Sequence, residues 1–159
     1  MRKFIIHSAS PSDAAVVSSM VQQLLEEIMR VTGSAHFHVD LPATVQRCER
    51  FLTQGMYAVF IALETDTNTP VGFISLTETC SLYAEGVFGI MPELYVQPAF
   101  RSSGVGELLL DAAKAYGRSK GWQRLEVTTP PLPEFDRTLA FYQRNDFEVA
   151  GGRKMKVLL

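Results

Sequence analysis

The chain has 159 residues, 47% of them apolar and 20% charged, a balance typical of an ordered soluble protein rather than a disordered one. Its formal net charge of −2 argues against nucleic acid as the main partner. No apolar run reaches the roughly 20 residues of a membrane span, and the first apolar run is too short for a signal peptide. We therefore expect one cytoplasmic domain over residues 1–159, with no membrane partner.

The first third of the chain predicts one strand and two helices. Residues 3–8 have strand character, and a capping box at Ser10 and Asp13 then starts a helix. Apolar residues at helical spacing continue as far as Gly33, a residue suited to the left-handed C-cap. A second helix is predicted over about residues 42–52.

The middle of the chain predicts three strands. Residues 57–63 and 71–76 are rich in apolar and aromatic residues, and the polar turn over 64–70 makes them partners. A further strand is predicted over residues 89–96. Pro92 lies inside it and cannot donate a ladder hydrogen bond, which indicates a bulge or an interruption there.

The last third predicts two helices and a closing hairpin. Helical spacing indicates a long helix over 104–120 and a short one over 137–144, for which Asp136 can serve as N-cap. Strand character marks three segments, the last two forming a hairpin: 125–129, 147–150 and 155–159. Strands and helices mix without repeats or a linker, so the fold class is α/β (α+β) in one domain.

The segment between the strand over 89–96 and the helix over 104–120 predicts an anion-binding turn. A helix N-terminus presents unpaired N–H groups and the positive end of the helix dipole. Arg101 adds a charge that can partner a phosphate, and small residues let an anion approach the backbone: Ser102, Ser103, Gly104 and Gly106. The plainer alternative is that these glycines only permit a tight turn. The sequence matches neither a nucleotide P-loop nor a Rossmann fingerprint.

A longer pattern carries a family resemblance. The spacing V-x-P-x-x-R-x-x-G-x-G resembles the central motif of the GNAT superfamily of acyl-CoA-dependent N-acetyltransferases, matched at Val96, Pro98, Arg101, Gly104 and Gly106. Residues 140–147 resemble a later A-x-x-F-Y-x-x-x-G-F segment of that family. Two positions depart from it: Asp136 stands where the family often has Asn, and Asp146 where it usually has Gly.

The resemblance implies a mixed, mostly antiparallel, seven-stranded sheet flanked by about four helices, with central strands splayed to hold acetyl-CoA. The pyrophosphate of this co-substrate would lie on the backbone of the motif turn, at Arg101, Ser102, Ser103, Gly104, Val105 and Gly106. Its pantetheine would pair with exposed backbone at Leu94, Tyr95 and Val96. Asp136 occupies the place of a family residue that can contact the pantetheine arm.

Acetyl transfer to an amine requires a neutral amine, a polarised carbonyl and a protonated leaving thiolate. The family match makes Tyr142 the candidate general acid, against the alternative of an ordinary core aromatic. Glu93, at the strand interruption, is the candidate base, with Glu78 or water as alternatives and a structural carboxylate as the plainer reading. The Val96 N–H is the first candidate to polarise the thioester oxygen.

Other features bear on partners. Acidic residues Glu78, Glu85 and Glu93 favour a cationic acceptor, either a small molecule or a peptide amine. The segment 36–38, His-Phe-His, has the spacing of two ligands on one side of a strand but indicates no third ligand. We therefore expect no metal, and a loop lining the acceptor pocket.

The family suggests a homodimer. The alternative function is a non-catalytic CoA-binding sensor or interaction module.

Overall fold

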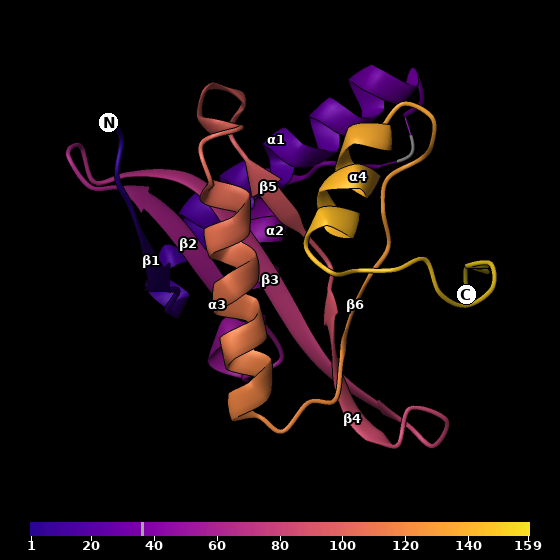
Figure 1. Ribbon diagram of the computed structural model, residues 1–159. Helices are drawn as coiled ribbons and strands as arrows, with labels where there is room; N and C mark the ends of the chain where they lie inside the picture. Colours follow the sequence, from indigo (N-terminus) through magenta and orange to yellow (C-terminus); the bar gives the residue numbers. More distant parts are fainter. Residues whose placement is uncertain (36) are drawn as a thin grey trace. The chain divides into compact units, whose positions relative to one another are not determined.

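The computed structural model describes residues 1–35 and 37–159, which form two compact units, Met1–Thr128 and Thr129–Leu159. Within these residues, all strands lie in the first unit, together with three of the four α-helices. Figure 1 shows the sheet of the first unit with helices on both of its faces. No α-helix among the described residues has the length and apolar character required to span a bilayer.

The first helix begins where its capping residues predict. A 3₁₀ turn over Pro11–Asp13 leads into α1, Ala14–Thr32. The Ser10 N–H donates to Asp13 Oδ2 at 2.8 Å, which satisfies one of the groups that a helix start leaves without a partner. The helix ends at Gly33, whose φ of 68° is left-handed backbone that glycine adopts without strain.

The next two helices are also close to their predicted bounds. Helix α2 spans Leu41–Thr53, and its N-cap Asp40 accepts the Ala43 N–H on Oδ1 at 3.0 Å. Helix α3 spans Val105–Ser119. Its apolar stripe is fully buried at four positions, Val105, Leu109, Leu110 and Ala113.

In the part of the chain that the structure describes, the sheet has six strands: β1 Phe4–Ser8, β2 Ala58–Glu64, β3 Thr69–Ser81, β4 Gly86–Met91, β5 Leu94–Val96 and β6 Leu125–Val127. Strands β1 to β4 pair in order and antiparallel, β5 pairs antiparallel with β3, and β6 pairs parallel with β4. The predicted mixed, mostly antiparallel architecture is therefore confirmed.

The predicted interruption at Pro92 is a β-bulge. Strand β3 advances three positions from Ile74 to Thr77, whereas the strand opposite advances four, from Ile90 to Leu94. Strand β6 pairs with β4 before the bulge, and in the described residues no pairing joins it to β5 beyond the bulge. Strands β5 and β6 are therefore separated beyond the bulge, as expected for a sheet whose central strands are splayed.

The two faces of the sheet carry different helices. Helices α1 and α2 pack on one face, where Val17 and Cys48 join a cluster with the β3 residue Phe73. Helix α3 packs on the other face, where Leu109 approaches Gly72 so closely that a Cβ there would lie 3.4 Å from Cδ1. A register shift against β2 interrupts the alternation of side chains at Val71. From Gly72 onward, β3 presents its odd-numbered residues to α1 and α2 and its even-numbered residues to α3.

The second unit differs from the sequence prediction at two points. Helix α4 spans Asp136–Arg144 with Phe135 as its N-cap, so Asp136 lies in the first turn and is not the cap. The hairpin predicted over 147–150 and 155–159 is wrong, because neither segment forms a strand. Over residues 1–35 and 37–159 the sheet has six strands rather than seven. Apolar character favours a strand only where a partner covers it, and Val149 and Val157 are 78% and 80% exposed.

Candidate active site

The anion-binding turn predicted before α3 has the expected geometry. A 3₁₀ turn over Pro98–Phe100 leads into exposed residues 101–104, and Gly104 precedes α3 with a φ of 89°. The first intrahelical bond runs from the Leu108 N–H to the Gly104 carbonyl at 3.1 Å. The N–H groups of residues 105–107 therefore have no acceptor within the helix. The turn and the helix start together offer a set of backbone donors to an anion.

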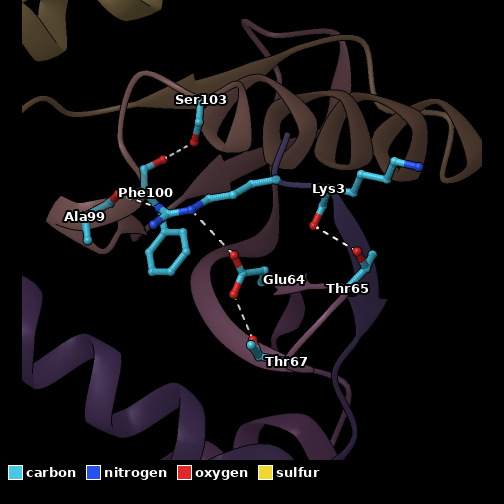
Figure 2. Close-up of polar contacts among 8 residues, drawn as sticks. Lys3, Glu64, Thr65, Thr67, Ala99, Phe100 and Ser103 are labelled. Atoms are coloured by element: carbon cyan, nitrogen blue, oxygen red, sulfur yellow. Dashed lines mark hydrogen bonds and ion pairs between the residues drawn. The ribbon is translucent and has the colours of Figure 1, made fainter.

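The N-terminal residues hold this turn from one side. Figure 2 shows Ala99, Phe100 and Ser103 of the turn close to Glu64 at the end of β2. Arg2 links them, since its Nη1 donates to the Ala99 carbonyl at 3.0 Å and its guanidinium lies 4.6 Å from the centre of the Phe100 ring. Its Nε is 3.6 Å from Glu64 Oε1. The Ser103 hydroxyl donates to the Phe100 carbonyl, which closes the turn on itself.

The Arg101 side chain is already engaged by protein groups. Its Nε donates to the Val96 carbonyl at 2.8 Å, and its Nη2 donates to both carboxylate oxygens of Glu27 at 2.9 and 3.1 Å. Its guanidinium also lies 5.6 Å from the centre of the Tyr95 ring. The charge predicted to partner a phosphate is therefore paired with a carboxylate on α1.

Strand β5 has one open edge. Its inner edge is bonded to β3 through the Glu93 carbonyl at 3.0 Å and the Gln97 N–H at 2.8 Å. In an antiparallel ladder the intervening residues Leu94 and Val96 turn their backbone groups outward. Tyr95 instead faces its partner on β3, and its side chain is buried. Of the three residues expected to meet pantetheine, Leu94 and Val96 thus carry the outward-facing groups.

The bulge places the Glu93 carboxyl on the α1–α2 face, where it bonds to two hydroxyl groups. The Tyr57 hydroxyl donates to both carboxyl oxygens at 3.1 Å, and the Ser75 hydroxyl donates to Oε2. The Glu93 N–H in turn donates to Ser75 Oγ at 3.0 Å. Ser75 is fully buried and Glu93 half-buried, so these hydroxyls replace much of the water that a carboxylate would otherwise bind.

The surroundings of Glu93 act on its pKa in opposite directions. Burial raises the pKa of this carboxyl, whereas the hydroxyls of Ser75 and Tyr57 lower it by bonding to the charged form. Burial and the nearby carboxylate raise the pKa of Tyr57, so this phenol stays protonated and remains a donor. The Cys48 thiol of α2 has its pKa raised by burial and, more weakly, by the charge of Glu93.

The alternative base, Glu78, lies on the opposite face of the sheet. It belongs to the even-numbered residues of β3 that face α3, and its Oε2 accepts the Trp122 indole N–H at 2.7 Å. Trp122 packs directly against Gly89, the residue opposite Glu78 on β4, where a Cβ would lie 2.2 Å from the ring. Trp122 therefore anchors the packing of this end of β4.

The candidate acid belongs to the second unit. Tyr142 is 5% exposed, and its ring meets those of Phe141 and Phe147 edge-on at centroid distances of 5.4 and 5.3 Å. Burial raises the pKa of its phenol, which keeps the hydroxyl protonated at neutral pH, as a general acid requires. Asp136 is exposed in the first turn of α4.

Four residues around these sites escaped sequence reasoning: Arg2, Glu27, Tyr57 and Ser75. Only Ser75 leaves a local signal, because it is a single polar residue inside the apolar run over 71–76. In the His-Phe-His segment, His36 lies outside the described residues. Across 1–35 and 37–159, no group of His, Cys, Asp and Glu side chains is arranged to hold a metal ion.

Comparison with known proteins places this geometry in a family. A family model described as an acetyltransferase (GNAT) domain matches residues 56–149. The curated relative YhfO of Bacillus subtilis (strain 168), described as an uncharacterized N-acetyltransferase, is 27% identical over 143 residues, covering 90% of this chain and 89% of its own.

Solved structures share the fold. An aminoglycoside N-acetyltransferase, AAC(6')-Iy in complex with CoA, is 20% identical with a TM-score of 0.79, and the match covers 99% of this chain and 96% of that one. A predicted acetyltransferase with acetyl-CoA from Clostridium acetobutylicum is 13% identical with a TM-score of 0.79, over 98% and 96% of the two chains. With a family match over more than half of its length and this shared fold, the chain belongs to the GNAT acetyltransferases and is an acyltransferase.

Proposed function

We propose that the protein transfers the acetyl group of acetyl-CoA to a primary amine by direct attack within a ternary complex. One observation carries the proposal: an open strand edge at β5 leads directly into exposed backbone donors at the start of α3. An acyl-CoA has amide groups that suit the first feature and a pyrophosphate that suits the second. The solved structures with bound CoA and acetyl-CoA support this choice of co-substrate.

The proposed binding site follows the chain through the turn. Leu94 offers its outward N–H and carbonyl to the acyl-pantetheine arm and Val96 offers its N–H, because the Val96 carbonyl already accepts from Arg101. The amides of residues 102–106 receive the pyrophosphate, since the Arg101 N–H donates to the Pro98 carbonyl. Tyr95 contributes its ring beneath Arg101 rather than its backbone. Asp136 remains a proposed contact for the pantetheine arm from α4.

The proposed chemistry starts with a proton. An alkyl ammonium has a pKa of about 10.4, so the acceptor must lose a proton before its nitrogen can attack. Glu93 takes this proton directly or through water. The amine nitrogen then bonds to the thioester carbon, the Val96 N–H stabilises the negative charge on the carbonyl oxygen, the C–S bond breaks, and Tyr142 protonates the departing sulfur.

Glu93 is preferred to Glu78 as the base on two observations. Glu93 precedes β5 directly, and its bonds to Tyr57 and Ser75 hold its carboxyl in place. Glu78 lies on the α3 face and is engaged by the Trp122 indole. Of the three acidic residues predicted to favour a cationic acceptor, only Glu93 lies at the bulge, since Glu78 faces α3 and Glu85 lies in the turn between β3 and β4. The aminoglycoside acetyltransferases with this fold make aminoglycosides a reasonable part of an acceptor screen, beside polyamines, amino acid derivatives and peptides.

A calorimetric titration with acetyl-CoA tests the site. We expect Gly104→Asp to abolish binding, because it places a carboxylate and a strained backbone in the turn. Gly55→Asp is the matched control, since both glycines have positive φ and open space around the missing Cβ. Absence of wild-type binding would contradict the proposal. Binding without thiol release for any amine in the screen would favour the non-catalytic CoA-binding module instead.

We further propose that the two compact units act together as one acetyltransferase domain and that the protein is a cytoplasmic homodimer. Light scattering at micromolar concentration tests the dimer, and a purely monomeric sample would contradict it.

A further inference from the structure

The Arg101 side chain poses a question that the motif alone does not answer. An arginine beside a phosphate-binding turn can attract the phosphates itself, or it can hold the turn in shape for its backbone to bind them. These two roles predict different surroundings for the guanidinium. A ligand-binding arginine needs unpaired donors that face the anion, whereas one that holds the turn needs its donors on protein groups.

The contacts of Arg101 correspond to the second role. Its Nε is bonded to the Val96 carbonyl, at the end of β5, and its Nη2 is bonded to both oxygens of Glu27 on α1. The Glu27 side chain is only 16% exposed, so water screens the pair less than a fully exposed one. The paired charges largely cancel, which weakens the attraction of Arg101 for an anion.

A second arginine holds the same turn from another side. Arg2 donates to the Ala99 carbonyl and stacks on the Phe100 ring, two residues and one residue before Arg101. Its Nε lies near Glu64, so this guanidinium also has a carboxylate partner. Each of the two arginines thus bonds to a backbone carbonyl next to the turn and is paired with an acidic residue outside it.

We propose that Arg101 is a positioning residue, which together with Glu27 fixes the turn over 101–104 so that its backbone amides receive the pyrophosphate of acetyl-CoA. Glu27 thereby becomes part of the cofactor site although it carries a negative charge and contacts no ligand. The inference rests on the proposed function, because it assumes that acetyl-CoA binds at this turn.

The direction in which one substitution changes the affinity for acetyl-CoA distinguishes the two roles. In Glu27→Gln, the charged contact of Arg101 Nη2 with two carboxylate oxygens is lost, and one negative charge near the turn is removed. If Arg101 binds phosphate, this change frees it, and acetyl-CoA binds more tightly. If the pair positions the turn, binding weakens, by about threefold to fivefold for loss of one partly exposed ion pair. Removal of a negative charge near the turn should by itself strengthen the binding of an anion. Weaker binding of acetyl-CoA by Glu27→Gln therefore cannot be explained by the change in charge.

Two further variants sharpen the comparison. Arg101→Lys keeps the charge but loses the planar, forked contact to Val96 and Glu27, so we expect it to weaken binding nearly as much as Arg101→Ala, about tenfold. The double variant Glu27→Gln with Arg101→Ala should bind no more weakly than Arg101→Ala alone, because the two residues act through one contact. Glu26→Gln is the control, with the same change on an exposed neighbour of the same helix, and should bind like the wild type.

Calorimetric titration with acetyl-CoA gives the dissociation constants, and steady-state kinetics provides a readout that a general loss of stability would not produce. We expect a higher KM for acetyl-CoA, with kcat and the KM for the amine unchanged. Tighter binding by Glu27→Gln, or wild-type binding by Arg101→Lys, would overturn the inference while leaving acetyl-CoA binding itself established. A wild type that does not bind acetyl-CoA would overturn both this inference and the proposed function.

Discussion

At the scale of single residues, the environment of Glu93 decides whether it can act as a base. A carboxyl in an apolar setting tends to hold its proton, and burial raises its pKa in this way. The two hydroxyl donors favour the ionised form that a base requires. Tyr57 and Ser75 bond to this carboxyl and lower its pKa, and its charge also raises the pKa of the Cys48 thiol.

Tyr57→Phe removes one of these donors while keeping the ring. The lowering effect on Glu93 is lost, its pKa rises further, and the acidic limb of the kcat/KM profile should move to higher pH. Tyr116→Phe is the matched control, since Tyr116 lies on α3, which packs against the opposite face of the sheet. A profile measured with saturating acetyl-CoA checks this, and an unmoved acidic limb would remove Glu93 from the role of base.

Tyr142→Phe tests the acid separately. Loss of the phenolic proton should lower kcat by about tenfold or more, within the usual range for general acid catalysis, with little change in acetyl-CoA affinity. Phe141→Tyr in the same background tests whether a neighbouring hydroxyl restores turnover, and we expect that it does not. Unchanged kcat in Tyr142→Phe would exclude this residue as the acid.

At the scale of elements, the position of β4 is fixed by its close packing against Trp122. The missing side chain of Gly89 leaves room for the indole, which then reaches Glu78 on the neighbouring strand. Gly117 on α3 allows a second, looser approach, because a Cβ there would lie 3.0 Å from the same ring. These two glycines therefore determine how closely α3 and β4 pack against the Trp122 ring.

Alanine substitutions at these glycines should destabilise the protein in a graded way. Gly89→Ala should cost about 2–3 kcal/mol in the free energy of unfolding, as expected for an overpacked core, and Gly117→Ala less. Gly152→Ala meets nothing within 4 Å and serves as control. Urea unfolding monitored by Trp122 fluorescence gives the three values. Equal stability of Gly89→Ala and Gly152→Ala would contradict the packing described here.

At the scale of the whole molecule, the sequence predicts most elements because their signals are local. Gly33 ends α1 and Pro92 marks the bulge through backbone properties that do not depend on the rest of the fold. The prediction of a closing hairpin was wrong because a strand needs a partner strand, and the apolar character of residues 155–159 does not supply one. The Glu27–Arg101 pair joins residues 74 positions apart, a separation that no local pattern reveals.

The proposal of one acetyltransferase domain makes a thermodynamic prediction. We expect a single calorimetric unfolding transition, and acetyl-CoA at one hundred times its dissociation constant should stabilise the native state by about 2.7 kcal/mol. For a chain of this size, Tm should rise by roughly 5–10 °C. The Gly104→Asp variant should show no rise. Two separate transitions, of which the ligand moves only one, would contradict the single domain.

The open edge of β5 also has a bearing on solubility. Unpaired strand edges invite pairing with strands of other chains, the usual beginning of aggregation. Here the strand is three residues long and is followed, one residue later, by Pro98, while Pro92 stands two positions before it. Proline has no N–H to donate, so a foreign strand finds too short a ladder to extend. The short edge is still long enough to pair with a small ligand. The protein can therefore keep an unpaired strand edge without aggregating through it.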